Sequence, residues 1–427
     1  MHIMPAACPP STVADSNVDP ALTTLYRRVR DATDALTAQL QPEDSVLQSM
    51  PECSPAKWHL AHTSWFFEQF VLSRDPHYQP LHPRWMYLFN SYYQSVGAMH
   101  ARAERGLLSR PTLTEIRDYR HHVDEAMQML LAKGIDTEAH SIVVVGLNHE
   151  QQHQELLLTD LKHLLSRNPL EPAFLQVPAR DNHARDVPLR YVQGREGLAE
   201  IGHAGGGFAF DNECPRHQVL LHPHALANRP INNREYQDFI RDGGYQNAGL
   251  WMAEGWAVVQ AETWQRPLYW AEDDASRFGL FGRSELDPLA PVCHVSFYEA
   301  DAFARWAGAR LPTEAEWEVR AQEQSPIDGN FQESGQLEPL PPVSDTGMLQ
   351  MFGDVWEWTS SPYVNYPGFQ PWSGSLGEYN AKFMCGQWVL RGGSCLTPLD
   401  HIRASYRNFF YPRDRWQCTG IRLGKSP

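Results

Sequence analysis

The sequence predicts an α+β protein of two domains, a four-helix bundle followed by a domain of short strands, short helices and long loops. Two observations support this class. Four helical stretches lie between residues 20 and 167, which is the number that a bundle requires. Beyond about residue 190, glycine, proline and tryptophan become frequent and apolar runs shorten, as in loop-rich α+β domains. A chain of 427 residues is long enough for both domains.

The N-terminal part reads as a disordered leader, residues 1–19, and then the bundle, residues 20–167. The third helix is expected to end at Gly134, and prolines exclude a long helix from residues 72–110. The four predicted helices cover residues 20–40, 57–71, 113–133 and 141–165.

The C-terminal part is predicted to begin after a linker, residues 168–190, which contains two X-Pro steps close together. The second domain then spans residues 191–427. From Pro312 onward we expect long loops punctuated by glycine and proline. The predicted strands and short helices before that point are strands within 190–194, 206–212 and 217–226 and helices within 232–243 and 297–308.

Composition excludes several classes of function. The formal net charge is −15, from 36 basic and 51 acidic residues, so a broad nucleic-acid surface is not expected. No apolar run is long enough to span a membrane, and the N-terminus lacks the pattern of a secretory signal. The cysteine count is odd, the spacing is irregular and no CxxC occurs, which argues against a disulfide framework or a thiolate zinc site and predicts a cytoplasmic protein. The seven cysteines are Cys8, Cys53, Cys214, Cys293, Cys385, Cys395 and Cys418.

The stretch LNHEQQHQELLL, residues 147–158, is the strongest chemical signal in the chain. His149 and His153 are four residues apart in a predicted helix, so both imidazoles lie on one face and can close on one metal ion. Gln152 borders that face. Glu155 projects to nearly the opposite side from His153, which predicts a supporting role. The alternative for the histidine pair is two polar residues on a solvated helix face.

A third metal ligand must come from another element, and the helix at residues 57–71 is the candidate. His59 and His62 are three apart there, so both can face inward. Three neutral imidazoles without a carboxylate suit zinc, iron, copper or nickel, and three protein ligands leave the open positions of a catalytic site. The alternative for His62 is a hydrogen-bonded core histidine.

Residues 90–111 contain a second set of candidates. Tyr92 and Tyr93 are adjacent, so in an extended segment they would point to opposite sides. Arg102, Arg105 and Arg110 cluster in an otherwise acidic protein, and arginine binds carboxylates bidentately. The alternatives are buried aromatic packing for the tyrosines and a solvated loop for the arginines.

The C-terminal part contains a third set, five motifs rich in tryptophan, glycine, arginine and glutamate. Composition predicts packing motifs, with tryptophan anchors, glycine turns and buried ion pairs. The motifs lie at residues 310–321, 351–363, 389–394, 403–410 and 420–423.

Together these residues resemble the iron-dependent sulfoxide synthases of ergothioneine biosynthesis. WHLAHTSWFFE and HEQQHQE are similar to the motifs of a DinB-like helical bundle. LPTEAEWE, GDVWEWTSSPY, LRGGS and GIRL are similar to those of the formylglycine-generating-enzyme, or sulfatase-modifying, fold, which is related to C-type lectins. The resemblance covers roughly residues 20–424, and the order of the motifs makes it specific.

The resemblance implies a mononuclear non-heme Fe(II) site and O₂ as co-substrate. Its metal ligands correspond to His62, His149 and His153, while His59 matches a position that is not a ligand. Gln152 matches a residue that contacts hercynine, which is Nα-trimethylhistidine.

The resemblance also implies binding residues for both substrates. Arg102 and Arg105 match basic residues that hold carboxylates of the thiol substrate. Asn408 and Phe409 fall where the family binds the betaine end of hercynine. Aromatic faces attract quaternary ammonium groups, so further candidates for that contact are Phe410 and Trp416.

The chain departs from one branch of the family at three places. Phe410 and Asp414 stand where that branch has the Asp and Arg that help to recognise γ-glutamylcysteine, so free cysteine is a plausible thiol donor. That branch carries its catalytic tyrosine on a C-terminal loop, and the corresponding stretch here, residues 363–374, aligns poorly. In the other branch adjacent tyrosines take over, which correspond to Tyr92 and Tyr93.

The expected reaction joins the sulfur of cysteine or γ-glutamylcysteine to imidazole C2 of hercynine and oxidises that sulfur to a sulfoxide. One of Tyr92 and Tyr93 is expected to donate a proton or hydrogen bond to oxygen. The three substrates would be held together, so that the reaction becomes a rearrangement between positioned groups. Small-molecule substrates are the expected partners, with no nucleic acid or membrane.

Three other functions compete with this one. A DinB-type thiol transferase with zinc or nickel would need no oxygen, but it leaves the second domain unexplained. A copper formylglycine-generating oxidase needs a particular cysteine pair, and Cys395 and Cys418 have a different spacing. A lectin-like binding module predicts no metal at the histidines.

The sister synthases of ovothiol biosynthesis append a methyltransferase domain, so a chain ending at Pro427 favours the ergothioneine branch.

Overall fold

The structure is a computed structural model that describes residues 18–178 and 184–427. It divides into two compact units. The helical unit comprises the chain up to Asn168 together with two later segments, Gly206–Phe210 and Gln370–Ala381. The sheet unit comprises the remaining residues. The predicted leader, residues 1–19, lies almost wholly outside the described residues.

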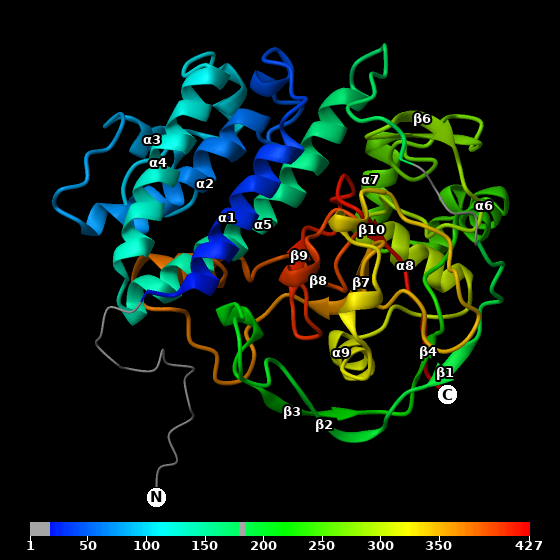
Figure 1. Ribbon diagram of the computed structural model, residues 1–427. Helices are drawn as coiled ribbons and strands as arrows, with labels where there is room; N and C mark the ends of the chain where they lie inside the picture. Colours follow the sequence, from blue (N-terminus) through cyan, green and yellow to red (C-terminus); the bar gives the residue numbers. More distant parts are fainter. Residues whose placement is uncertain (1–17, 179–183) are drawn as a thin grey trace, which may run out of the picture. The chain divides into compact units, whose positions relative to one another are not determined.

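The described part of the helical unit contains four long helices, which confirms the helical half of the predicted α+β class (Figure 1). Side-chain caps fix three of the starts: Asp19 for the first helix, the Thr112 capping box for the third and Asp136 for the fourth. No helix in the described part of the chain is long and apolar enough to cross a membrane. The helices are α1 (Pro20–Leu36), α2 (Ala56–Phe70), α4 (Leu113–Lys133) and α5 (Thr137–Ser166), with a short α3 (Trp85–Phe89) in the irregular segment.

Helices α2 and α5 approach each other closely because α5 carries a glycine at their contact. A Cβ atom on Gly146 would lie only 2.6 Å from a ring carbon of Phe67 and 2.8 Å from one of Phe66. Only glycine fits this approach without displacing the two rings. The contact sets the His149 turn of α5 against α2.

A buried charge network joins α1, α4 and α5. The Glu150 carboxylate, fully buried, accepts hydrogen bonds from Arg30 Nη1 at 2.9 Å, Arg120 Nη2 at 2.8 Å and Thr33 Oγ1 at 2.7 Å. Burial raises the pKa of Glu150, but the two arginines outweigh it and hold that pKa at about 2. The ion pairs therefore fix the rotation of α5 next to its histidines.

Two loop segments from later in the sequence complete the helical unit. The carboxylate of Glu378 accepts hydrogen bonds from the backbone N–H groups of Gln94, at 3.0 Å, and Ser95, at 2.9 Å. The ring of Phe210 stacks on that of Tyr379 with centroids 5.4 Å apart. These contacts fasten both segments to the bundle.

The predicted strand within residues 206–212 is wrong. Residues 206–210 form an irregular loop, followed by a short 3₁₀ turn at Asp211–Glu213. Gly205, Gly206 and Gly207 have φ values of +85°, +83° and +75°, which a strand does not adopt. The glycine run, not the aromatic residues that follow it, therefore decides the local structure.

In its described residues the sheet unit contains a four-stranded sheet, a three-stranded sheet and two two-stranded sheets, β2-β3 and β5-β6 (Figure 1). The four-stranded sheet has the order β10-β7-β8-β9, in which β10 and β7 are parallel and the other pairs antiparallel. The three-stranded sheet has the order β1-β4-β11. The strands are β1 (Tyr191–Gln193), β2 (Gly197–Ile201), β3 (His217–Leu221), β4 (Ala225–Ala227), β5 (Ser276–Gly279), β6 (Gly282–Glu285), β7 (Trp356–Pro362), β8 (Trp388–Arg391), β9 (Asn408–Phe410), β10 (Thr419–Gly420) and β11 (Gly424–Lys425).

Four helices accompany these strands, and two of them match predicted helices. The expectation of long loops from Pro312 onward is wrong in part, because α9 and the strands β7 to β11 lie in this region. These elements are short and rich in buried charged residues, so apolar periodicity did not reveal them. The helices are α6 (Asn233–Arg241), α7 (Ala253–Glu262), α8 (Phe297–Trp306) and α9 (Glu314–Ala321).

Buried ion pairs between the C-terminal motifs hold the sheet unit together, as the packing interpretation predicts. Arg422 Nη2 lies 2.7 Å from Glu357 Oε1, and both side chains are fully buried. Arg391 Nη2 lies 2.8 Å from Glu314 Oε2 and 3.0 Å from Glu318 Oε2. Each pair connects two different motifs, so these residues serve the fold.

Candidate metal centre and substrate site

Three imidazole rings converge in the core of the helical unit. His62 comes from α2, and His149 and His153 come from successive turns of α5. One nitrogen from each ring lies within 4.8 Å of the other two. The Nε2 atoms of His62 and His149 are 3.2 Å apart. The predicted three-histidine cluster therefore exists, with the spacing of one helical turn supplying two of its members.

The protonation state of these rings suits a metal ion. His62 Nδ1 lies 2.6 Å from the Phe89 carbonyl oxygen, to which it donates, so His62 Nε2 carries a lone pair directed at His149. Burial lowers the pKa of all three rings, that of His149 to about 3. Two nitrogens about 2.1 Å from one ion at a right angle would be about 3.0 Å apart, close to the observed separation. The residues fit a bound cation.

His153 is oriented by a chain of polar groups behind it. Its Nδ1 lies 2.8 Å from His59 Nδ1, and His59 Nε2 lies 3.1 Å from Asp160 Oδ2. The same carboxylate oxygen accepts a hydrogen bond from the Ser54 backbone N–H at 2.8 Å. His59 is therefore outside the three-histidine cluster and lies behind His153.

Aromatic rings and a buried arginine enclose His62. The ring of Trp58 stacks on His62 with centroids 4.5 Å apart, and that of Trp65 lies at 5.5 Å. The guanidinium of Arg105 lies 3.4 Å from the centroid of the Trp58 ring. It also donates to Ser54 Oγ at 2.9 Å.

The predicted arginines differ in their surroundings. Arg105 is buried, and burial holds its pKa well below the usual range of arginine. Arg102 is exposed, and its Nη2 donates to the backbone carbonyl of Glu52. Arg110 is also exposed and bonds the Ser109 carbonyl. Of the three, only Arg105 contacts an aromatic ring that packs on a histidine of the cluster.

Three tyrosines gather beside the cluster. The rings of Tyr92 and Tyr93 lie 4.7 Å apart, so the expectation that they diverge is wrong, because the chain bends at residue 92 and turns at residues 94–96. Tyr93 is fully buried against Trp65. The ring of Tyr379 lies 6.0 Å from that of Tyr92.

Tyr379 is a site residue that the sequence did not reveal. Its ring lies 5.6 Å from the His149 ring, and its hydroxyl donates to Gln152 Oε1. Gln152 therefore borders the cluster, as its helical position predicts. Tyr379 lies five residues beyond the stretch at 363–374 that aligns poorly, and only the course of the loop brings it to α5.

The four remaining predicted site residues belong to the sheet unit. Asn408, Phe409 and Phe410 form the edge strand β9, next to β8. Phe409 stacks on Tyr363 with centroids 4.0 Å apart, and Phe410 and Trp416 lie 6.3 Å apart. The strand thus presents an aromatic group that is only partly buried.

Comparison with known proteins defines the class of the chain. Residues 190–339 and 325–427 match the family described as "Sulfatase-modifying factor enzyme 1-like domain". The chain is 34% identical to the hercynine oxygenase of Mycobacterium tuberculosis over 87% of this chain and 91% of that protein. It is 32% identical to the hercynine oxygenase of Mycolicibacterium thermoresistibile over 93% of this chain and 94% of that protein. Ergothioneine biosynthesis protein 1 of Schizosaccharomyces pombe is 31% identical over 51% of this chain and 28% of that protein.

These matches identify an oxygenase whose C-terminal part is a sulfatase-modifying-factor-like domain. The chain belongs to the hercynine oxygenase family. The α+β class with a helical N-terminal region and a sulfatase-modifying-type C-terminal region, predicted from the motifs, is confirmed.

Proposed function

We propose that this enzyme acts in ergothioneine biosynthesis as a non-heme iron sulfoxide synthase. The observation that carries this proposal is the buried cluster of His62, His149 and His153, in a chain of the hercynine oxygenase family. The overall change is hercynine + thiol + O₂ → sulfoxide + H₂O. The imidazole C2–H and the S–H bonds break, a C–S bond forms, one oxygen atom goes to sulfur and the other leaves as water.

The three histidines would hold Fe(II), which when bound supplies the redox chemistry that O₂ requires. Neutral imidazoles are the correct ligand form, because burial keeps them unprotonated near neutral pH. His59 and Asp160 keep the His153 ring in position.

The arginines are proposed to bind the thiol substrate through its carboxylates. Arg105 is already desolvated, so a bidentate carboxylate partner would gain more there than at a surface arginine. Arg102, at the surface, would steer and hold a second carboxylate. Both residues lie in the same 3₁₀ segment, Arg102–Leu107.

Hercynine is proposed to bind through its imidazole and its quaternary ammonium group. Gln152, one residue from His153 on α5, would contact the imidazole side of the molecule. The quaternary ammonium group would meet aromatic faces and neutral polar groups, the environment that such cations prefer. The residues proposed for that end are Asn408, Phe409, Phe410 and Trp416.

A tyrosine hydroxyl is proposed to donate the proton that directs oxygen to sulfur. Tyr92 and Tyr93 are the predicted donors, and Tyr379 joins them because its ring lies next to His149. Its hydrogen bond to Gln152 holds the phenol Oη beside the amide that is proposed to contact hercynine. Burial raises the pKa of Tyr92 and Tyr93, so both remain protonated at neutral pH.

We expect Tyr379→Phe to lower the ratio of sulfoxide to simple thiol-oxidation products by about 10²-fold, since a positioned proton donor contributes that much. The double variant Tyr92→Phe/Tyr93→Phe should lower it as well. Product ratios from the iron-loaded enzyme with hercynine, thiol and O₂ are read by mass spectrometry. Tyr87→Phe, an exposed tyrosine of the same unit, is the control. A wild-type enzyme that forms no sulfoxide refutes the function, and unchanged ratios in all variants remove the tyrosines from it.

A further inference from the structure

A second cluster of metal-binding side chains lies within the sheet unit. Cys293, His294 and Cys418 each offer one donor atom, and these atoms lie within 4.8 Å of one another. A third thiol, Cys395, lies beside Cys418 but is not one of these three donors. All four side chains are buried, with exposed fractions from 0% to 4%. The spacing of the cysteines argued against a thiolate site, but the fold brings together three segments that are far apart in sequence.

The backbone conformation at His294 lets the adjacent side chains of Cys293 and His294 point into the same cluster. In an extended segment the side chains of Cys293 and His294 would point to opposite faces. His294 instead has a φ of +66°, an uncommon conformation for a residue other than glycine. Its carbonyl oxygen accepts a hydrogen bond from the Leu268 N–H at 3.1 Å, which holds this turn. Such backbone conformations concentrate at ligand sites.

The two other segments are also held by backbone hydrogen bonds. The Trp356 N–H donates to the Cys418 carbonyl oxygen at 2.8 Å, which places Cys418 at the end of the four-stranded sheet. The Cys395 N–H donates to the Asp354 carbonyl oxygen at 3.1 Å. The donors therefore sit on fixed backbone, which lowers the cost of ordering them around an ion.

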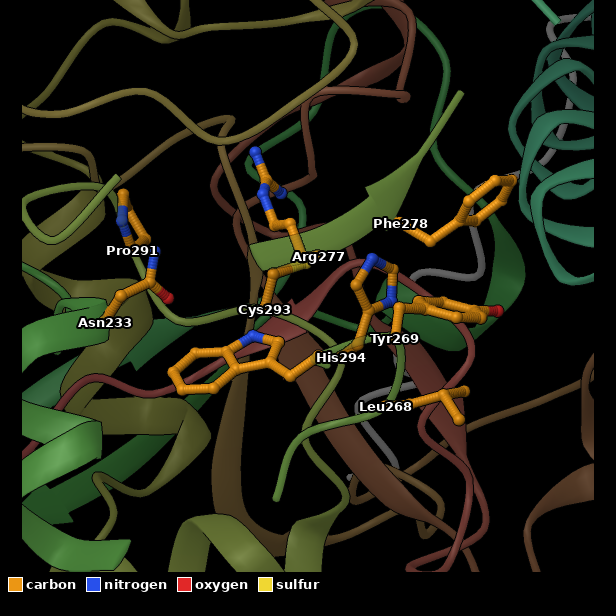
Figure 2. Close-up of a pocket in the computed structure, with 9 residues that line it drawn as sticks. Asn233, Leu268, Tyr269, Arg277, Phe278, Pro291, Cys293 and His294 are labelled. Atoms are coloured by element: carbon orange, nitrogen blue, oxygen red, sulfur yellow. The ribbon is translucent and has the colours of Figure 1, made fainter. Parts of the chain in front are cut away.

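A small pocket borders the cluster (Figure 2). Cys293 and His294 both line it, and the His294 ring meets the Tyr269 ring edge to face with centroids 4.7 Å apart. Arg277 lines the same pocket, and its Nη2 lies 2.7 Å from Glu338 Oε2. Two of the three donors thus lie on the wall of this pocket.

We propose that Cys293, His294 and Cys418 bind one soft d¹⁰ cation, and that Zn²⁺ is the occupant. Thiolates with an imidazole and no carboxylate select soft cations, and zinc takes both kinds of ligand. With Zn–S bonds of about 2.3 Å, two sulfurs of a tetrahedral site lie about 3.8 Å apart, which the observed cluster accommodates. The ion would join the segment before α8 to the residue directly before β10.

Cobalt substitution tests this proposal on the full-length chain. Reduced, metal-free protein is titrated with Co²⁺, which gives a thiolate-to-cobalt charge-transfer band only where cysteine is a ligand. Because the three-histidine site contains no thiolate, the band reports the second cluster alone. We expect the band to appear in the wild type and in His149→Ala, and to disappear when Zn²⁺ is added. If Cu⁺ displaces Co²⁺ from the cluster and Zn²⁺ does not, the occupant is Cu⁺ and not Zn²⁺.

Two variants complete the test. Cys418→Ser is expected to lose the band, whereas Cys53→Ser, which alters a buried thiol of the helical unit, should keep it. Zinc-loaded wild type should also melt at a higher temperature than the metal-free protein. A wild-type protein with all thiols reduced, native circular dichroism and no thiolate band overturns the proposal, whatever the variants do. A disulfide within the cluster of the freshly purified protein, found by mass spectrometry, overturns it as well.

Discussion

Replacing His149 with alanine is expected to remove iron from the protein and to abolish sulfoxide formation. The change deletes one of the three proposed ligands from a buried site, and water is a poor substitute in that surrounding. The iron affinity should fall by at least about 10²-fold, since even the loss of a supporting group costs up to that much. Iron per chain after gel filtration and product by mass spectrometry measure the two effects.

Two further histidine variants make this result specific. His59→Ala should weaken iron binding by about 10- to 10²-fold, because His59 supports the His153 ring without being a ligand. His163 lies on the same helix, but its Nδ1 lies 2.7 Å from Ser49 Oγ. The variant His163→Ala should therefore retain full iron content. Equal iron content in His149→Ala and His163→Ala would show that the metal is bound elsewhere.

Glu150→Gln is expected to destabilise the protein by about 3–5 kcal/mol, the cost of leaving buried charges without their partner. The substitution preserves shape but removes the carboxylate that faces both Arg30 and Arg120. Each arginine keeps one other acidic neighbour, Asp124 and Asp34 respectively, so the unit is weakened without losing every ion pair. Urea unfolding of the full chain, followed by circular dichroism at the helical signal, measures the loss.

The control for this prediction is Glu138→Gln on the same helix. Glu138 pairs with Arg74 at 2.7 Å but is largely exposed, so its loss should change stability by less than about 1 kcal/mol. If Glu150→Gln costs no more than Glu138→Gln, the buried network does not hold α5 in place.

Local signals predicted the helical unit well. The periodicity of α1 and α5, the Pro55 start of α2 and Gly134 after α4 each act within a few residues, and the helices follow them. The histidine cluster was predictable for the same reason, because two ligands share one helix face. The third member, His62, comes from a single neighbouring helix, α2.

Features that depend on tertiary contacts were not predictable from the sequence. Tyr379 reaches the bundle through a loop that Glu378 fastens to Gln94 and Ser95, and no periodicity encodes that pairing. Strand β7 is built around buried charge, including Glu357 paired with Arg422, so its pattern resembles a loop. The Cys293, His294 and Cys418 cluster of the sheet unit likewise arises from two segments that are far apart in sequence.

The oxygenase chemistry at the histidine cluster is tested most directly by isotope labelling. Iron-loaded enzyme is incubated with hercynine, ¹⁸O₂ and either cysteine or γ-glutamylcysteine, and the products are read by mass. We expect a hercynyl sulfoxide that carries one ¹⁸O atom, and the thiol that reacts faster identifies the thiol donor. A C–S product without ¹⁸O, or product formed equally well without oxygen, would contradict the assignment and indicate a thiol transferase.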